Sequence, residues 1–169
     1  MPRCFILGAL VLMACSGGDS PAGTISEGAE MTDAQLSALA RSTSGFTLYK
    51  NRPDTLQRSA GSGHSEARLQ TRYNTLAARQ LDANGKVKSG AVFADSSLIV
   101  KELINGTTLS RYAVMYKLRG SKNAGNGGWL WAYYAPDGTP QIGISGRGQS
   151  CQGCHSAGFD FTRMNDSHP

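Results

Sequence analysis

What this 169-residue chain lacks narrows its class before any motif is considered. It has no run of five or more like charges, and its 17 Lys and Arg residues are scattered among 12 Asp and Glu, so a nucleic-acid-binding surface is not indicated. It has no internal repeat and no apolar run long enough to span a bilayer. Its four cysteines are not placed like a disulfide framework. The remaining composition, 40% hydrophobic with 21 glycines, is typical of one turn-rich globular domain.

The first 14 residues predict export. A charged start at Arg3 precedes an apolar run over residues 5–14, which has the length of a signal-peptide core. The run ends at Cys15 in Leu-Met-Ala-Cys, which resembles the lipobox of bacterial lipoproteins; the alternative is an ordinary signal peptide with an incidental cysteine. Residues 15–31 would form a tether, and Ser16 favours sorting to the outer membrane. We therefore expect a bacterial cell-envelope lipoprotein that faces the periplasm and contacts the membrane only through lipid on Cys15.

Residues 32–169 predict one α+β domain. Thr32 begins a capping box and an apolar stripe, which together indicate a helix ending before Gly45. Ser65 is placed to cap a second helix over residues 66–82, in which apolar residues recur at helical spacing. Four strand-like runs are also present, over residues 46–50, 97–104, 111–118 and 129–134. Two N-terminal helices followed by successive strands predict an antiparallel β-sheet.

The strongest chemical signal is Cys151-Gln152-Gly153-Cys154-His155, a C-x-x-C-H motif of the kind that attaches c-type haem. Each thiol would form a thioether with one haem vinyl group, and His155 would be the proximal iron ligand. We expect one covalent haem c, held by this C-terminal segment. Two alternatives are weaker: a thioredoxin-like pair would begin a helix after an early strand, and a zinc site would need a fourth ligand, for which only His168 is near.

No residue is an obvious sixth iron ligand. Met115 falls in a strand-like run and is expected in the core, and His64 is expected to cap a helix or lie on the surface. Met164 and His168 follow the haem motif too closely to reach the opposite face of the haem, and Met31 carries no further signal. We therefore expect an open sixth position, at which small ligands can bind.

Residues 61–162 resemble the cytochrome P-460 family, which includes the cytochromes c′-beta. The resemblance rests on short segments in a fixed order: Ser62-Gly63-His64, Tyr73-Asn74, residues 93–103, Val114-Met115-Tyr116-Lys117, residues 129–134, the C-x-x-C-H motif and Asp160-Phe161-Thr162. The resemblance implies a β-rich and commonly dimeric domain with a C-terminal haem c.

The resemblance also implies roles for residues around the haem. Cytochromes P-460 oxidise hydroxylamine and carry a haem cross-linked to a lysine, and Lys101 falls at that lysine's position, although Val-Lys-Glu-Leu is equally typical of a solvated strand lysine. Cytochromes c′-beta lack the cross-link and bind nitric oxide and carbon monoxide in an apolar distal pocket, to which Phe93 would contribute. Arg68 or Arg72 would donate to the bound ligand. Ala113 stands where P-460 enzymes have a pocket carboxylate.

These observations predict an exported mono-haem c protein that binds nitric oxide or carbon monoxide, or that oxidises hydroxylamine if Lys101 is cross-linked. A periplasmic electron-transfer partner and a homodimer are expected with it. One alternative is a plain electron-transfer cytochrome with a strong sixth ligand. Another is an accessory haem lipoprotein that binds gas without turnover.

Overall fold

The computed structural model describes residues 30–163. The expected signal segment, Cys15 and nearly all of the expected tether lie outside the described residues, as do Met164 and His168. Within residues 30–163, no helix has the length and apolar character needed to cross a membrane.

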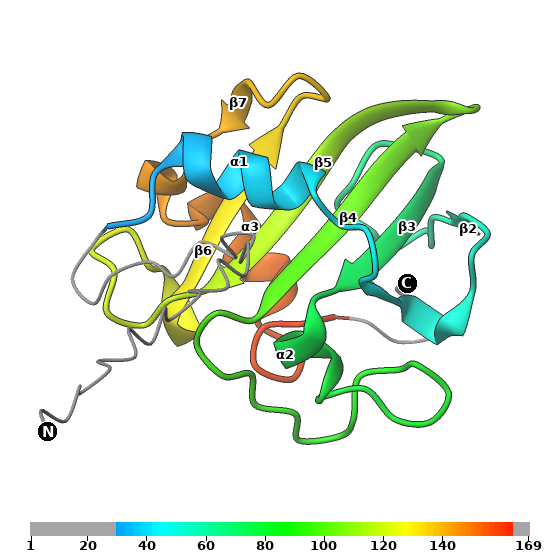
Figure 1. The fold of residues 1–169 in the computed structure, drawn as a ribbon, viewed down its shortest axis with the longest axis horizontal. Helices are drawn as coiled ribbons and strands as arrows, with labels where there is room; N and C mark the ends of the chain where they lie inside the picture. The colour runs from blue at the N-terminus through cyan, green and yellow to red at the C-terminus, as the bar shows by residue number, and fades with distance from the viewer. Residues whose placement is uncertain (1–29, 164–169) are drawn as a thin grey trace, which may run out of the picture.

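The described part of the chain is organised around one antiparallel sheet of seven strands. Its strand order is β1-β3-β4-β5-β6-β7, and β2 pairs separately with β3. From β3 onward, each strand pairs with the next one in the chain, so the sheet is a meander (Figure 1). The strands are β1 (Thr47–Leu48), β2 (Leu56–Gln57), β3 (Arg68–Tyr73), β4 (Leu98–Asn105), β5 (Thr108–Lys117), β6 (Trp129–Tyr134) and β7 (Pro140–Ile142).

Short helices accompany the sheet, which confirms an α+β architecture. Helix α1 forms where the capping box predicts it: the Thr32 hydroxyl accepts from the Gln35 backbone, and the Gln35 side chain accepts from the Thr32 backbone. Helix α1 lies across one face of the sheet (Figure 1). The helices are α1 (Asp33–Arg41), α2 (Thr75–Ala78) and α3 (Gln149–His155), with 3₁₀ turns η1 (Tyr49–Asn51), η2 (Asn126–Gly128) and η3 (Ile144–Gly146).

The predicted second helix over residues 66–82 is wrong. This segment forms strand β3, and only its continuation turns into the four-residue helix α2. Leu69 and Tyr73 are four residues apart, a spacing that places two side chains on one face of a helix and equally on one face of a strand. Residues 68–73 pair one-to-one with β4, so this segment has the two-residue period of a strand and not the period of a helix. Only one N-terminal helix of the predicted pair therefore exists.

The alternation of side chains along the central strands divides the core into two layers. On one face, Val100, Val114 and Ala132 pack with Leu36 and Ala40 of α1. On the other face, the odd-numbered residues of β4, β5 and β6 meet the segments that follow β3 and β7. Cys151 and Phe161 of the C-terminal segment pack against the layer on this second face, so a site on this face can include that segment.

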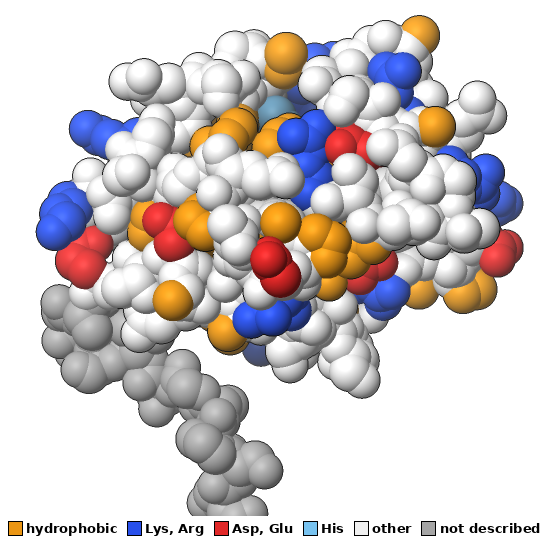
Figure 2. Space-filling model, turned by 90° about the horizontal axis from the view of Figure 1, so that it is seen from above, with side chains coloured by type: hydrophobic (Ala, Val, Ile, Leu, Met, Phe, Trp, Pro, Cys, Tyr) orange, Lys and Arg blue, Asp and Glu red, His pale blue; other side chains and the backbone are white. Residues whose placement is uncertain are grey.

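The surface carries both signs of charge. Figure 2 shows Lys and Arg side chains interspersed with Asp and Glu over the visible face, with no continuous basic area there. Binding along a nucleic-acid backbone depends on such an area.

The α1 layer offers a stability test at Asp33. Its Oδ1 accepts hydrogen bonds from the hydroxyl of the fully buried Tyr134 (2.8 Å) and from the Ile144 amide (3.0 Å), so one carboxylate joins α1, β6 and η3. We expect Asp33→Ala to lower the free energy of unfolding by about 2–3 kcal/mol, because two buried donors lose their acceptor. Asp33→Asn keeps an acceptor and should lose less than about 1 kcal/mol. Urea unfolding followed by circular dichroism measures both; equal losses would contradict the assignment.

Candidate functional site

Two cross-strand rows of side chains form one wall of a cavity within residues 30–163. Ile99, Met115 and Trp131 lie opposite one another on β4, β5 and β6. One step along the strands, Lys101 and Tyr133 flank Ala113. Because Ala113 has the smallest side chain of its row, space remains between Lys101 and Tyr133. All six residues line a cavity of about 240 Å³.

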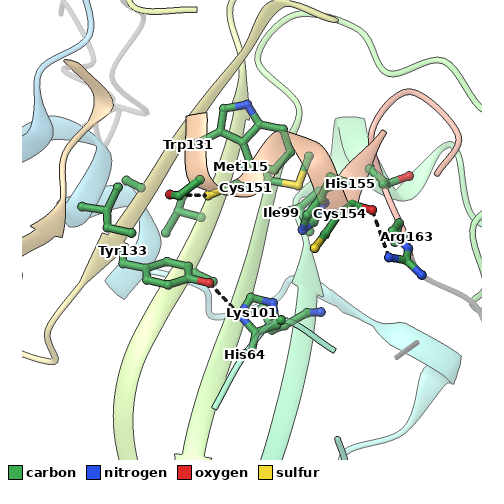
Figure 3. Close-up of a pocket in the computed structure, with 17 residues that line it drawn as sticks. His64, Ile99, Lys101, Met115, Trp131, Tyr133, Cys151, Cys154, His155 and Arg163 are labelled. Carbon is green, nitrogen blue, oxygen red and sulfur yellow. Dashed lines mark hydrogen bonds between the residues drawn. The ribbon is translucent and has the colours of Figure 1, made fainter. Parts of the chain in front are cut away.

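Helix α3 places the haem-motif residues at this same cavity. Cys151, Cys154 and His155 all line it, so the structure brings them together with Lys101 (Figure 3). Helix α3 begins directly after Gly148, which has a φ of +68° and lies so close to Trp131 that a Cβ there would collide with the indole ring. A glycine is therefore needed for α3 to approach the sheet this closely.

His155 is held in a defined orientation. Its Nδ1 lies 2.8 Å from the Phe161 carbonyl oxygen, and its ring meets the edge of Trp131 with centroids 4.8 Å apart. Because a carbonyl only accepts, Nδ1 carries the proton and the imidazole lone pair is on Nε2. A histidine metal ligand is commonly oriented in this way by a carbonyl on its other nitrogen.

The Phe161 carbonyl is itself fixed by Asp160. The Asp160 carboxylate accepts from Lys117 Nζ at 2.7 and 2.8 Å and from the Phe93 amide at 2.8 Å. The Asp160 carbonyl accepts from the Trp129 indole. Asp160 and Phe161 both have positive φ, at 45° and 63°, which non-glycine residues seldom adopt. This Asp160 clamp holds an unusual turn in place directly beneath His155.

Three of the predicted pocket residues lie elsewhere. Phe93 is buried against Trp129 and does not line the cavity, although its amide takes part in the Asp160 clamp. Arg68 donates to Thr55, and Arg72 forms an ion pair with Glu102. Both arginines project from strand β3 rather than from a helix, and neither lines the cavity. The structure thus gives none of the three a place in the pocket.

Two pocket residues were not predicted. His64 was expected at a helix cap or on the surface, but it is buried and lines the cavity. Tyr133 also lines the cavity, and its hydroxyl lies 2.7 Å from His64 Nδ1. The sequence feature that could have identified His64 is Ser62-Gly63-His64, the first segment of the family resemblance. This segment has no local periodicity that distinguishes it from an ordinary loop.

Lys101 is buried on the cavity wall, with 6% of its surface exposed. Burial lowers the pKa of its amine to about 8, so about a tenth of it is neutral at pH 7, far more than for an exposed lysine. The cavity-lining residues that the structure describes include no Asp or Glu. Ala113 lies directly opposite Lys101 on β5. By the resemblance, this is the position at which P-460 enzymes have a pocket carboxylate.

The chemistry of the two cysteines argues against a thioredoxin-like redox pair, whereas the zinc alternative stays open. Both thiols are free, and burial raises the pKa of Cys151, although a hydrogen bond with Ser150 works in the opposite direction. Redox-active cysteines have lowered pKa values instead. Within residues 30–163, no cluster of three or more His, Cys, Asp or Glu is arranged to hold a metal ion. The zinc alternative would need His168, which lies outside the described residues.

Comparison with models of protein families gave no match. Comparison with curated proteins gave none either.

The Asp160 clamp makes a prediction about stability. Lys117 and Asp160 expose only 2% and 11% of their side chains, so removing either charge leaves the other buried and unpaired. We expect Lys117→Met and Asp160→Asn each to lower the free energy of unfolding by about 3–5 kcal/mol, and the double variant to lose less than the sum. The matched control is Asp95→Asn, which breaks the exposed Arg119–Asp95 pair and should cost less than about 1 kcal/mol. Additive losses in urea unfolding would show that the pair is uncoupled.

Lys101 makes a prediction about pH. Its pKa is about 8 in the folded chain and near 10.4 when unfolded, so the unfolded state binds more protons between these values. Stability from this group therefore rises with pH, by about 3 kcal/mol over the whole interval. We expect the unfolding free energy of Lys101→Met, relative to the parent chain, to show its largest advantage at pH 7 and to lose that advantage by pH 10. A pH-independent difference would contradict the lowered pKa.

Proposed function

We propose that this chain is an exported mono-haem c protein whose haem occupies the cavity beside α3 and binds small nitrogen oxides at an open iron position. One observation carries the proposal: both thiols of the C-x-x-C-H motif and its histidine face the same cavity against the sheet. The order of motifs that resembles the cytochrome P-460 family supports it independently of this geometry.

The residues present fit a covalent haem. Cys151 and Cys154 are separated by about one turn on α3 and both face the cavity as free thiols. His155 keeps its lone pair on Nε2, the form that binds iron. The cavity also has apolar walls from Ile99 and Met115, which suit a porphyrin face. A bound haem would supply an iron centre that coordinates diatomic ligands.

Different residues of the chain would then hold the iron, exclude water and leave space for the ligand. His155 would hold the iron from the α3 side, with its basicity set by the Phe161 carbonyl. Ile99 and Met115 would exclude water, and Ala113 would leave room for a small ligand. Apart from His155, the described cavity residues include one methionine, Met115, and one histidine, His64, so these two are the side chains to consider for the sixth position.

Oxidation of hydroxylamine is a second candidate, favoured by the position of Lys101. Lys101 lines the same cavity as the motif residues, and its lowered pKa leaves a fraction of the amine neutral, as a covalent bond from its nitrogen would require. The same cavity lacks a carboxylate to accept the substrate's protons, and a missing general base costs on the order of 10²–10⁴ in rate. Ligand binding is therefore the leading function.

The remaining features are part of the same proposal. Lipidation at Cys15 would tether the domain to the cell envelope, with the outer membrane favoured. A periplasmic electron-transfer partner would reduce the iron, and two copies would form a homodimer.

Expression with a c-type haem maturation system tests the proposal. We expect one covalent haem per chain and a reduced high-spin spectrum that shifts with carbon monoxide. Cys151→Ser and Cys154→Ser should each lose one thioether bond, and His155→Ala should lose the proximal ligand; Gln149→Ala, at an exposed position of the same helix that does not line the cavity, should keep the attachment and spectrum unchanged. A strongly red-shifted Soret band that Lys101→Met abolishes would identify the cross-link and favour hydroxylamine oxidation.

Two results would overturn the proposal. Absence of covalent haem under these conditions would remove its basis. A low-spin ferrous spectrum that carbon monoxide does not change would favour an electron-transfer cytochrome with a filled sixth position instead.

A further inference from the structure

We infer that His64, oriented by the Tyr133 hydroxyl, donates a hydrogen bond to the ligand in this pocket and thereby selects nitrogen oxides over carbon monoxide. This inference rests on the proposed function. It gives a specific role to a residue that the family resemblance leaves without one.

The contact between His64 and Tyr133 is direct and shielded. His64 exposes 8% of its surface and lines the cavity from the loop before β3. Tyr133 reaches it from β6, with the hydroxyl oxygen 2.7 Å from Nδ1 (Figure 3). A Cβ at the neighbouring Gly63 would lie 3.8 Å from Cys154 Sγ, so the loop that carries His64 lies beside a haem-attachment thiol.

The chemistry of Tyr133 determines which imidazole nitrogen carries the proton. Burial is the main cause that raises the pKa of Tyr133 to about 12, so the phenol keeps its proton at any physiological pH. A phenol is a better donor than acceptor, and donation to Nδ1 requires that nitrogen to be unprotonated. The proton of a neutral His64 is then on Nε2. In this form Nε2–H is a hydrogen-bond donor and cannot coordinate iron.

The surrounding charges hold this pair in place. Arg111 forms an ion pair with Glu66 at 2.7 Å and donates to Ser65 at 2.9 Å, which ties the two residues after His64 to β5. The same guanidinium lies over the Tyr133 ring, 4.7 Å from its centroid. Arg111 therefore contacts both the segment that carries His64 and the tyrosine that orients it.

Two other charged side chains line the cavity, Lys101 and Arg163. Lys101 belongs to the same cross-strand row as Tyr133, and Arg163 donates to the Cys154 carbonyl, which directs it toward α3. A neutral donor would stabilise a bound ligand that carries or gains negative charge, such as nitrite, dioxygen or nitric oxide. Carbon monoxide gains little charge, so it would benefit least from the hydrogen bond.

The test uses the haem-loaded protein and its carbon monoxide complex, because the C–O stretching frequency falls when a donor points at the bound ligand. We expect His64→Leu to raise this frequency and to speed release of nitric oxide more than release of carbon monoxide, by about 2- to 10-fold, which corresponds to one hydrogen bond. His64→Gln restores an N–H donor and should recover part of the shift. Tyr133→Phe should move the frequency in the same direction as His64→Leu. Tyr112→Phe, on the opposite face of the sheet, is the matched control and should change nothing.

The outcomes separate this inference from the proposed function. If the protein binds carbon monoxide but neither His64→Leu nor Tyr133→Phe moves the stretching frequency, the inference is wrong and the haem assignment stands. If the parent protein is low-spin and His64→Leu makes it high-spin and reactive with carbon monoxide, His64 is an iron ligand, and both the inference and the open site are wrong.

Discussion

The position of the proposed haem ligand depends on one partly buried carboxylate. Asp160 receives two hydrogen bonds from Lys117 of β5 and one from the Phe93 amide, while its own carbonyl holds the Trp129 indole. These contacts fix a turn with two left-handed non-glycine residues, a conformation that the turn alone would not keep. The next carbonyl in the chain orients His155. Lys117 of the sheet is thereby connected to His155 by way of Asp160 and Phe161, so a displacement of Lys117 would also displace the group that orients His155.

The register of β4, β5 and β6 determines what faces the other side of the pocket. A slip of one residue in one of these strands would exchange the two faces of that strand. Lys101 of β4, Ala113 of β5 or Tyr133 of β6 would then point into the α1 layer instead. The aromatic and branched residues of both layers oppose such a slip, because each face packs against its own cluster. The same hydrophobic packing that stabilises the sheet therefore also specifies the row in which a lysine, an alanine and a tyrosine stand side by side.

The sequence predicted those parts of the fold whose pattern has a single interpretation. The strand-like runs over residues 97–104 and 129–134 became β4 and β6, and the capping box at Thr32 began α1. It failed where one spacing fits two structures, as at Leu69 and Tyr73. The site shows the same division: a contiguous motif identified Cys151 to His155, whereas His64 and Tyr133 are 69 positions apart and meet only through tertiary packing.

The absence of a carboxylate from the described cavity lining bears on what kind of chemistry the pocket favours. Oxidation of hydroxylamine removes protons with each electron pair, so a site for that reaction gains from an acceptor that is anionic at neutral pH. His64 is instead paired with a phenol that keeps its proton, which leaves the imidazole as a donor toward the cavity. Lys101 adds a second nitrogen whose pKa, about 8, keeps part of it protonated at pH 7. Under the proposed function, a pocket whose polar groups donate hydrogen bonds would stabilise negative charge on a bound ligand, which would favour holding a nitrogen oxide over removing protons from one.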